Sequence, residues 1–304
     1  MGALAGLLMA GAAAAVDISH IPGAFVDVGY GPRPMAMGGA YAGIADDVHA
    51  VLWNPAGLPR LQGRQATFMI ADQYGVVPTN YAAYAQPYGE RDGWALAAVT
   101  AGDEVLHEFT LIGAWGRTLA GIGSPLSSWS FGASARLRRA SFGDNSDPSP
   151  GHVSGDALGY SVDAGVLREL GRGFRLGGLV RDAANDLTWS SSASGEYSER
   201  VPTTWQAGLG FQDEGPLVVA FDVSSGFHRD THEKLHLGGE YRLDPALLFR
   251  GGFAQFIAAD PRRQYSAGVG IHLLFVSGRE VHVDGSFLTD EIGDTLRLGG
   301  TFVF

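Results

Sequence analysis

The residues of this chain that could carry out acid–base or metal chemistry are few, and the first group is an acidic pair, Asp46 and Asp47, followed by His49. Carboxylate and imidazole groups bind metal ions and transfer protons when they converge on one point. Neighbours in a chain do not converge by themselves, and an acidic residue before a short apolar stretch is a common helix cap. We therefore expect Asp46 or Asp47 to cap a helix over residues 47–53 and to make hydrogen bonds within the fold, rather than to form a catalytic or metal site.

The nine histidines raise the same question, because His228, His232 and His236 recur at every fourth position. That spacing aligns side chains on a helix, but here it runs from a polar loop into a strand-like segment, so we expect no shared metal ion. His152 and Ser154 match a His-x-Ser arrangement used by an outer-membrane lipid deacylase, yet they lie in a loop rich in Gly, Pro and Ser. No Gly-x-Ser-x-Gly, Walker or dinucleotide-binding motif occurs. The sequence predicts a protein without a cofactor, a metal ion or enzymatic activity.

Composition excludes several other classes. The 45 glycines among 304 residues are about twice the usual ~7% and show no Gly-X-Y period, which excludes collagen. Glycine inside a helix costs about 1 kcal/mol relative to alanine, so a helical bundle is disfavoured. A net charge of −11 argues against binding to nucleic acid, which relies on basic residues. Because there is no cysteine, disulfides, thiolate catalysis and Cys-ligated zinc are excluded.

The amino-terminal residues resemble a secretory signal. Residues 1–16 read MGALAGLLMAGAAAAV, and Ala13 to Ala15 match the small-x-small cleavage pattern, although the usual positively charged start is missing. We expect residues 1–15 to be a signal peptide that directs export. Further along the chain no run of 18 apolar residues could form a membrane-spanning helix.

From about residue 65 onward, apolar and polar residues alternate in segments of roughly ten residues, which is typical of β-strands. In residues 295–304 (TLRLGGTFVF), Leu296, Leu298 and Phe302 share one face while Arg297 and Thr301 share the other. The same pattern predicts fourteen strands, at residues 65–74, 79–88, 93–102, 107–116, 128–140, 156–168, 173–182, 202–211, 217–224, 233–242, 246–256, 263–274, 279–288 and 295–304.

An even number of half-apolar strands is what a bacterial outer-membrane barrel requires. Most alternate connections are short, and the longest ones, residues 141–155 and 183–201, fall at the other end of the predicted barrel. Residues 117–127 break this rule, so either a small extra element lies there or the strand count is wrong by one hairpin. A secreted β-sandwich also alternates, but the charged faces favour a closed all-β transmembrane antiparallel barrel over residues 64–304. We expect it in the outer membrane.

The polar strand faces would line the barrel lumen. We expect these residues to form a packed, mutually paired polar network rather than a continuous aqueous pore, because fourteen strands enclose less space than porins do. The residues concerned are Arg136, Arg138, Asp163, Arg175, Arg181, Asp222, Lys234, His236, Glu240, Arg242, Arg250, His272, His282, Asp284 and Arg297.

Residues 16–63 do not alternate and are rich in small side chains. Asn54 and Pro55 predict a turn, because the residue before a proline is pushed out of the helical region. We expect Asn54, Pro55 and Gly57 to fix that turn rather than to contact a ligand. A compact segment of this size ahead of a barrel predicts a hatch that plugs the lumen.

Residues 31–47 (GPRPMAMGGAYAGIADD) and 53–58 (WNPAGL) closely resemble the start of the PorV/PorQ family, relatives of the FadL-type outer-membrane transporters. Residues 237–243 (LGGEYRL), 265–271 (YSAGVGI) and the terminal aromatic strand show a weaker resemblance. The resemblance implies a fourteen-stranded barrel with an amino-terminal hatch. It also implies that Phe304 belongs to the signal read by the barrel-assembly machinery. The hatch motif comprises Gly38, Gly39, Asp46, Asp47, Asn54, Pro55 and Gly57.

The family resemblance implies two functions. FadL-type members move hydrophobic molecules through a hatch-gated lumen, by a route that can leave sideways through the wall. PorV-type members instead dock onto a secretion translocon and carry exported proteins. The expected partners are therefore outer-membrane lipid and the assembly machinery, together with either a small hydrophobic molecule or a secretion or surface protein. The first function is favoured here because the Arg- and Ala-rich composition differs from that of familiar secretion members.

Overall fold

The computed structural model describes residues 25, 29–103, 105–121, 123, 125–143, 153–227, 233–257, 261–275 and 278–304. Residues 1–15, His152, His228 and His232, on which some of the sequence predictions fall, lie outside the described residues. No helix in the described part of the chain is long and apolar enough to cross a membrane.

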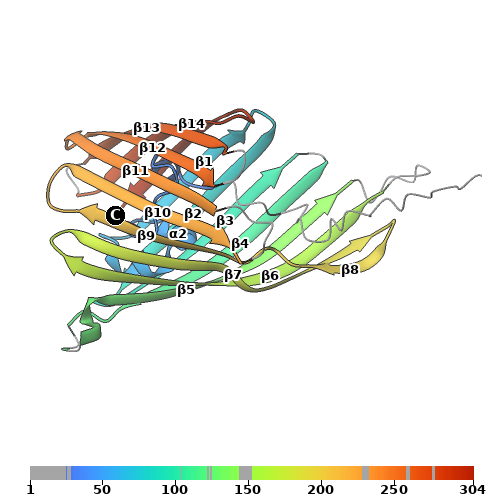
Figure 1. Ribbon diagram of the computed structural model, residues 1–304, viewed down its shortest axis with the longest axis horizontal. Helices are drawn as coiled ribbons and strands as arrows, with labels where there is room; N and C mark the ends of the chain where they lie inside the picture. The colour runs from blue at the N-terminus through green and yellow to red at the C-terminus, as the bar shows by residue number, and fades with distance from the viewer. Residues whose placement is uncertain are drawn as a thin grey trace, which may run out of the picture.

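Antiparallel strands make up most of the structure (Figure 1). Fourteen strands form a closed ring: neighbours along the chain pair with each other, β1 pairs with β15, and β7 pairs with both β6 and β9. This confirms the predicted fourteen-stranded antiparallel barrel. The ring strands are β1 (Gln65–Gln73), β2 (Val77–Tyr88), β3 (Asp92–Gly102), β4 (Leu106–Thr118), β5 (Trp129–Phe142), β6 (Gly155–Gly171), β7 (Phe174–Ser191), β9 (Thr204–Gln212), β10 (Leu217–Gly226), β11 (Glu233–Asp244), β12 (Leu247–Ile257), β13 (Arg263–Leu274), β14 (Glu280–Thr289) and β15 (Asp294–Val303).

Alternation along each strand separates an apolar outer face from a polar inner face. On β5, Leu137 is 59% exposed while its neighbour Arg138 is 4% exposed. On β15, Leu296 and Leu298 are exposed while Arg297 between them is buried. Such an outer surface is unfavourable in water but matches the hydrocarbon layer of a membrane.

Two connections differ from the sequence prediction. Residues 183–201 were expected to be a loop, but β7 continues to Ser191 and a fifteenth strand, β8 (Gly195–Glu199), pairs back onto it. In Figure 1 this hairpin projects beyond the ring. In the irregular connection 117–127, a short 3-10 helix, η3 (Pro125–Ser128), begins, so the extra-element alternative is the right one.

The wall is interrupted beside β7. The β7–β9 ladder ends at Arg181, the β7–β8 ladder begins at Leu187, and the β6–β7 register shifts between Val162 and Ala164. Asp182, at the start of this interval, has a left-handed φ of 54°. The Asn185 side chain bridges the interval by bonding the Val201 backbone, donating to its carbonyl oxygen at 3.0 Å and accepting from its N–H at 2.9 Å. A side chain therefore replaces ladder bonds at this point of the barrel.

Residues 29–62, here called the luminal segment, lie inside the ring (Figure 1). The segment contains the short helices α1 (Pro32–Ala36) and α2 (Ala50–Trp53) and the 3-10 helix η2 (Pro55–Arg60). The expected helix over residues 47–53 was too long. It begins at Ala50, and His49 occupies the N-cap position without a side-chain cap, so neither Asp46 nor Asp47 caps it. The Asp47 carboxylate instead accepts the His49 backbone N–H, which turns the chain ahead of the helix.

Glycines on the inner wall allow the luminal segment to approach the strands closely. A β-carbon added at any of them would lie within 3.0 Å of an atom of that segment. Each occupies a different strand, so the segment is held from most sides of the ring. These wall glycines are Gly93, Gly116, Gly132, Gly165, Gly177, Gly210, Gly238, Gly252, Gly268 and Gly299.

Adjacent glycines on β12 test this packing. A β-carbon at Gly252 would meet the Gly38 backbone nitrogen, whereas one at Gly251 meets nothing within 4 Å. We expect Gly252→Ala to destabilise the barrel by about 1–3 kcal/mol through overpacking. The Gly251→Ala control should leave stability unchanged. Heat-dependent mobility on detergent gels gives the unfolding temperature of each variant. Equal unfolding temperatures would contradict this packing.

Candidate functional site

The luminal segment lies between two cavities. Arg64 and Phe304 exchange backbone hydrogen bonds of 3.0 and 2.9 Å and mark one end of the barrel, here called the terminal end. The far cavity, of about 650 Å³, lies on the side of the segment away from that end. The terminal cavity, of about 280 Å³, is lined on the near side by polar and charged groups including Gln65, Thr301 and Glu280. A molecule that passes along the lumen must therefore displace the segment or go around it.

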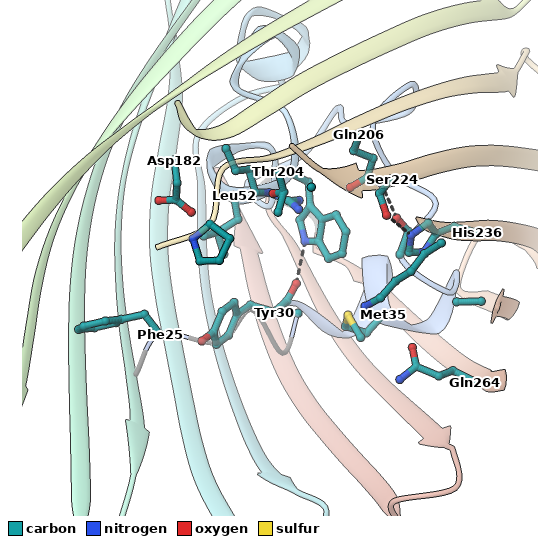
Figure 2. A pocket seen from close by; sticks show the side chains of 18 of the residues that line it. Phe25, Tyr30, Met35, Leu52, Asp182, Thr204, Gln206, Ser224, His236 and Gln264 are labelled. Atoms are coloured by element: carbon teal, nitrogen blue, oxygen red, sulfur yellow. Dashed lines mark hydrogen bonds between the residues drawn. The ribbon is translucent and has the colours of Figure 1, made fainter. Parts of the chain in front are cut away.

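Aromatic and aliphatic side chains line the far cavity together with polar and charged ones (Figure 2). Tyr30, Leu52 and Trp53 of the luminal segment form its floor. The cavity also reaches the interrupted part of the wall, where Asp182 and Val201 line it. Further apolar lining comes from Phe25, Met35, Val99, Ile112, Pro202, Trp205, Ala254, Phe256 and Leu288. A concave site in which apolar side chains are combined with polar groups can hold a small molecule.

Trp53 is fixed in the floor by three contacts. Its indole N–H donates to the Tyr30 carbonyl oxygen at 2.8 Å, a bond drawn in Figure 2. The Tyr41 ring meets it edge-on at 6.0 Å, and the Arg181 guanidinium lies 5.3 Å from its ring centroid. The floor is thus preorganised on the luminal segment rather than on the wall.

Asp222 and His236 hold the middle of the segment to the wall. The buried Asp222 carboxylate on β10 accepts the backbone N–H groups of Tyr41 and Ala42, both at 2.8 Å. His236 on β11 bonds the Gly38 carbonyl oxygen through Nδ1 at 2.7 Å. Because a carbonyl only accepts, this nitrogen carries the proton, and Nε2 accepts from the Ser224 hydroxyl at 2.8 Å.

A buried ion cluster lies on the terminal side of the segment. Arg33 contacts Asp46 at 2.8 Å, Asp47 at 2.9 Å and Glu240 of β11 at 2.9 Å. Burial by itself raises the pKa of Asp47, but His49, Arg33 and the Tyr41 hydroxyl outweigh it and bring that pKa to about 2. Asp47 therefore stays ionised at neutral pH.

The ion cluster continues into the wall. Arg250 on β12 donates to Glu240 at 2.6 Å and reaches Asp284 on β14. Arg33 thus bonds both to acidic groups of its own segment and to a wall carboxylate. Removing it would leave Asp46 and Asp47 without this cation and Glu240 with Arg250 alone.

Other predicted lumen residues are paired as well, and the Asp182 N–H donates to the Asp163 carboxylate at 2.9 Å, which links two of these pairs. Arg136 meets Asp163 at 2.6 Å, and Arg138 meets Asp182 at 2.8 Å. Elsewhere in the lumen, Arg175 bonds Gln212, Arg297 bonds Gln73 at 2.7 Å, and Arg242 is exposed and lines the terminal cavity.

The predicted hatch-motif glycines and Asn54 lie inside the ring. Gly38 and Gly39 have left-handed φ values of 65° and 77°, and Gly38 approaches the Phe253 backbone. The buried Asn54 side chain donates to the carbonyl oxygens of Ala42 and Val166 at 2.8 and 3.1 Å.

The turn after Asn54 is formed by η2. Pro55 begins this helix, Asn54 accepts the Ala56 N–H, and Gly57 packs against the Ala45 backbone. Asn54, Pro55 and Gly57 do not line the far cavity.

Sequence reasoning missed Arg33, Trp53 and Asp182 as site residues. The one available signal was Arg33, a charged residue between two prolines in an otherwise apolar stretch.

Among the described residues no group of three or more His, Asp or Glu side chains is arranged to hold a metal ion.

Replacing Arg33 tests the ion cluster. We expect Arg33→Gln to destabilise the folded protein by about 3 kcal/mol, because the partly buried Asp46 and Asp47 lose their cation and Glu240 loses one of its two. The Arg64→Gln control removes an exposed arginine just outside the segment and should change stability by less than about 0.5 kcal/mol. Unfolding in detergent micelles followed by circular dichroism gives both values. Equal losses of stability in the two variants would show that the cluster does not stabilise the fold.

Replacing Asp222 tests the docking of the segment. Asp222→Ala leaves the Tyr41 and Ala42 N–H groups without their acceptor, at a cost of about 1–3 kcal/mol for each group. Trypsin digestion should then cleave at Arg33 or Arg60 sooner than in the wild type. The Asp72→Ala control, on an exposed side chain of β1, should not change the digestion rate. Identical cleavage in the two variants would rule out this anchor.

Comparisons with known proteins identify the fold. No protein-family model and no curated protein matches the sequence. Among solved structures, the CymD monoaromatic hydrocarbon channel has a TM-score of 0.64 at 15% identity, covering 92% of this chain and 97% of that one. The Ralstonia pickettii toluene transporter TbuX has a TM-score of 0.64 at 16% identity, covering 90% and 97%. A Pseudomonas aeruginosa FadL homologue has a TM-score of 0.58 at 12% identity, covering 86% and 94%. The chain therefore has the barrel fold of the FadL-type channels.

Proposed function

We propose that the protein is an outer-membrane channel that binds small hydrophobic molecules in the far cavity and passes them through the lumen, with the luminal segment as its gate. The observation that carries this proposal is the position of the cavity: its floor is the luminal segment, so a bound molecule touches the element that blocks its path. The fold that the chain shares with a hydrocarbon channel and a toluene transporter supports the same function.

The apolar outer face supports placement in a membrane, with the terminal end facing the periplasm. In this orientation the far cavity opens toward the outside, where ligands arrive. Outer-membrane lipid and the barrel-assembly machinery are then the expected partners, and Phe304 at the strand end is proposed to contribute to the assembly signal.

The interrupted wall beside β7 offers a route out of the far cavity. Asp182, Val201 and Pro202 line both the cavity and the interval where strand pairing stops. We infer that a hydrophobic ligand leaves the cavity sideways there, because an apolar molecule gains by entering lipid instead of crossing the charged terminal cavity.

A second function is favoured by the β7–β8 hairpin. It projects beyond the ring, and the edge of β8 away from β7 has no strand partner among the described residues. Unpaired edges pair readily with another chain. A PorV-type barrel that docks a secretion translocon or a surface protein would use such an edge, and the PorV/PorQ assignment is proposed on residues 31–47 and 53–58.

Uptake by intact cells tests the channel function. Cells that lack other hydrocarbon channels should take up radiolabelled toluene faster when they express this chain. Ala254→Trp fills the far cavity from β12 and should abolish the increase, whereas Ala135→Trp, on the outer face of β5, should retain it. Equal uptake by the two variants would refute passage through this cavity. A translocon recovered with the wild-type barrel, together with unchanged toluene uptake, would favour the docking function.

A further inference from the structure

Two side chains bridge the wall interval beside β7. Residues 182–186 of β7 form one edge of this interval, and residues 200–203, which join β8 to β9, form the other. The bridging side chains are those of Asn185 and Thr203. Pro202 favours the break in strand pairing, because a proline has no N–H to donate to a ladder.

The Asn185 side chain takes the place of a ladder residue. Its amide donates to the Val201 carbonyl oxygen at 3.0 Å and accepts the Val201 N–H at 2.9 Å. The amide also donates to the Asp182 carbonyl oxygen at 2.8 Å, which fixes its orientation on β7. The Thr203 hydroxyl donates to the same carbonyl oxygen at 2.7 Å. The two edges are thus joined by amide and hydroxyl groups that a rotation about side-chain bonds can release.

The β7 edge of the interval is the more firmly held of the two. Strand β6 pairs with β7 on both sides of the register shift. The Asp182 N–H donates to the Asp163 carboxylate at 2.9 Å, and the Asp182 carboxylate meets Arg138 at 2.8 Å. Residues 200–203, by contrast, belong to no strand. They are therefore the edge that moves when the interval opens.

We propose that Asn185 is a latch that holds residues 200–203 against β7 and thereby limits how fast a ligand leaves the far cavity through the wall. Its two bonds to Val201 are far fewer than those of a paired strand, because the ladder stops at Arg181 and resumes at Leu187. Asn185 does not line the far cavity, so it is a positioning residue that acts on ligand exit rather than on ligand binding. This inference rests on the proposed sideways exit and names the residue that regulates it.

Substitutions at the interval test the latch through the rate of toluene uptake per folded barrel. Asn185→Ala removes both bonds to Val201, and we expect uptake about tenfold faster than in the wild type. Thr203→Val removes one bond and should give a smaller increase. The Asn80→Ala control removes an exposed asparagine that bonds Thr100 across an intact ladder, and it should change nothing. Heat-dependent gel mobility measures the folded fraction of each variant.

A reversible cross-link tests the same latch in the closed state, because the chain has no cysteine of its own. Asn185→Cys combined with Val201→Cys is joined by a short bifunctional methanethiosulfonate reagent. We expect fast uptake before the reaction, background uptake after it, and recovery when a reductant cleaves the link. The control pair, Thr188→Cys with Ser198→Cys, joins paired residues of β7 and β8, so its cross-link should not alter uptake. A purely structural role of Asn185 would not give a loss that a reductant reverses.

The outcomes separate the latch from the channel function. Uptake that continues through the barrel cross-linked at the interval, or an unchanged rate in Asn185→Ala, would overturn the latch. If Ala254→Trp still blocks uptake in that case, the channel function stands and the ligand leaves by another path. Absence of uptake by the wild-type protein would overturn both proposals.

Discussion

The close approach of the luminal segment to a glycine-lined wall is the constraint on which the rest of the structure depends. Ten strands each place a glycine where a side chain would collide with the segment. Backbone brought this near to a wall and away from water needs hydrogen-bond partners. Asp222, His236 and Ser266 provide these partners from the strands. The wall thus offers glycines that leave room for the segment and side chains that bond to its backbone.

Once the segment is held in this way, its two faces differ. Trp53 and Leu52 face the far cavity, whereas Arg33 faces the acidic groups of the terminal side. An apolar ligand therefore meets an apolar floor, and the ions that fix the segment lie behind it. Opening such a gate would break the ion pairs of Arg33, which costs free energy unless the carboxylates keep another cation. The wall interval near Asp182 offers a path on which those pairs stay intact.

The barrel could be predicted from the sequence because alternation is a local property. Apart from the far end of β7, every ring strand begins and ends within about three residues of its predicted bounds. Lipid on one side and a polar lumen on the other impose an alternation of period two. The β7–β8 hairpin was missed because it projects beyond the ring and its residues, such as Ser190 and Ser191, do not alternate. The left-handed turn at Asp182 and the Arg33–Glu240 ion pair, 207 residues apart in sequence, have no local signature.

Hydrogen–deuterium exchange over residues 29–62 in the full chain, reconstituted in lipid nanodiscs, tests the central claim most directly. If the segment is packed against the glycine wall, peptides covering Ala36 to Leu58 exchange as slowly as those from the ring strands, because water does not reach their buried amides. Exchange at the rate of an unstructured peptide, with the strands still protected, would contradict a lumen closed by this segment.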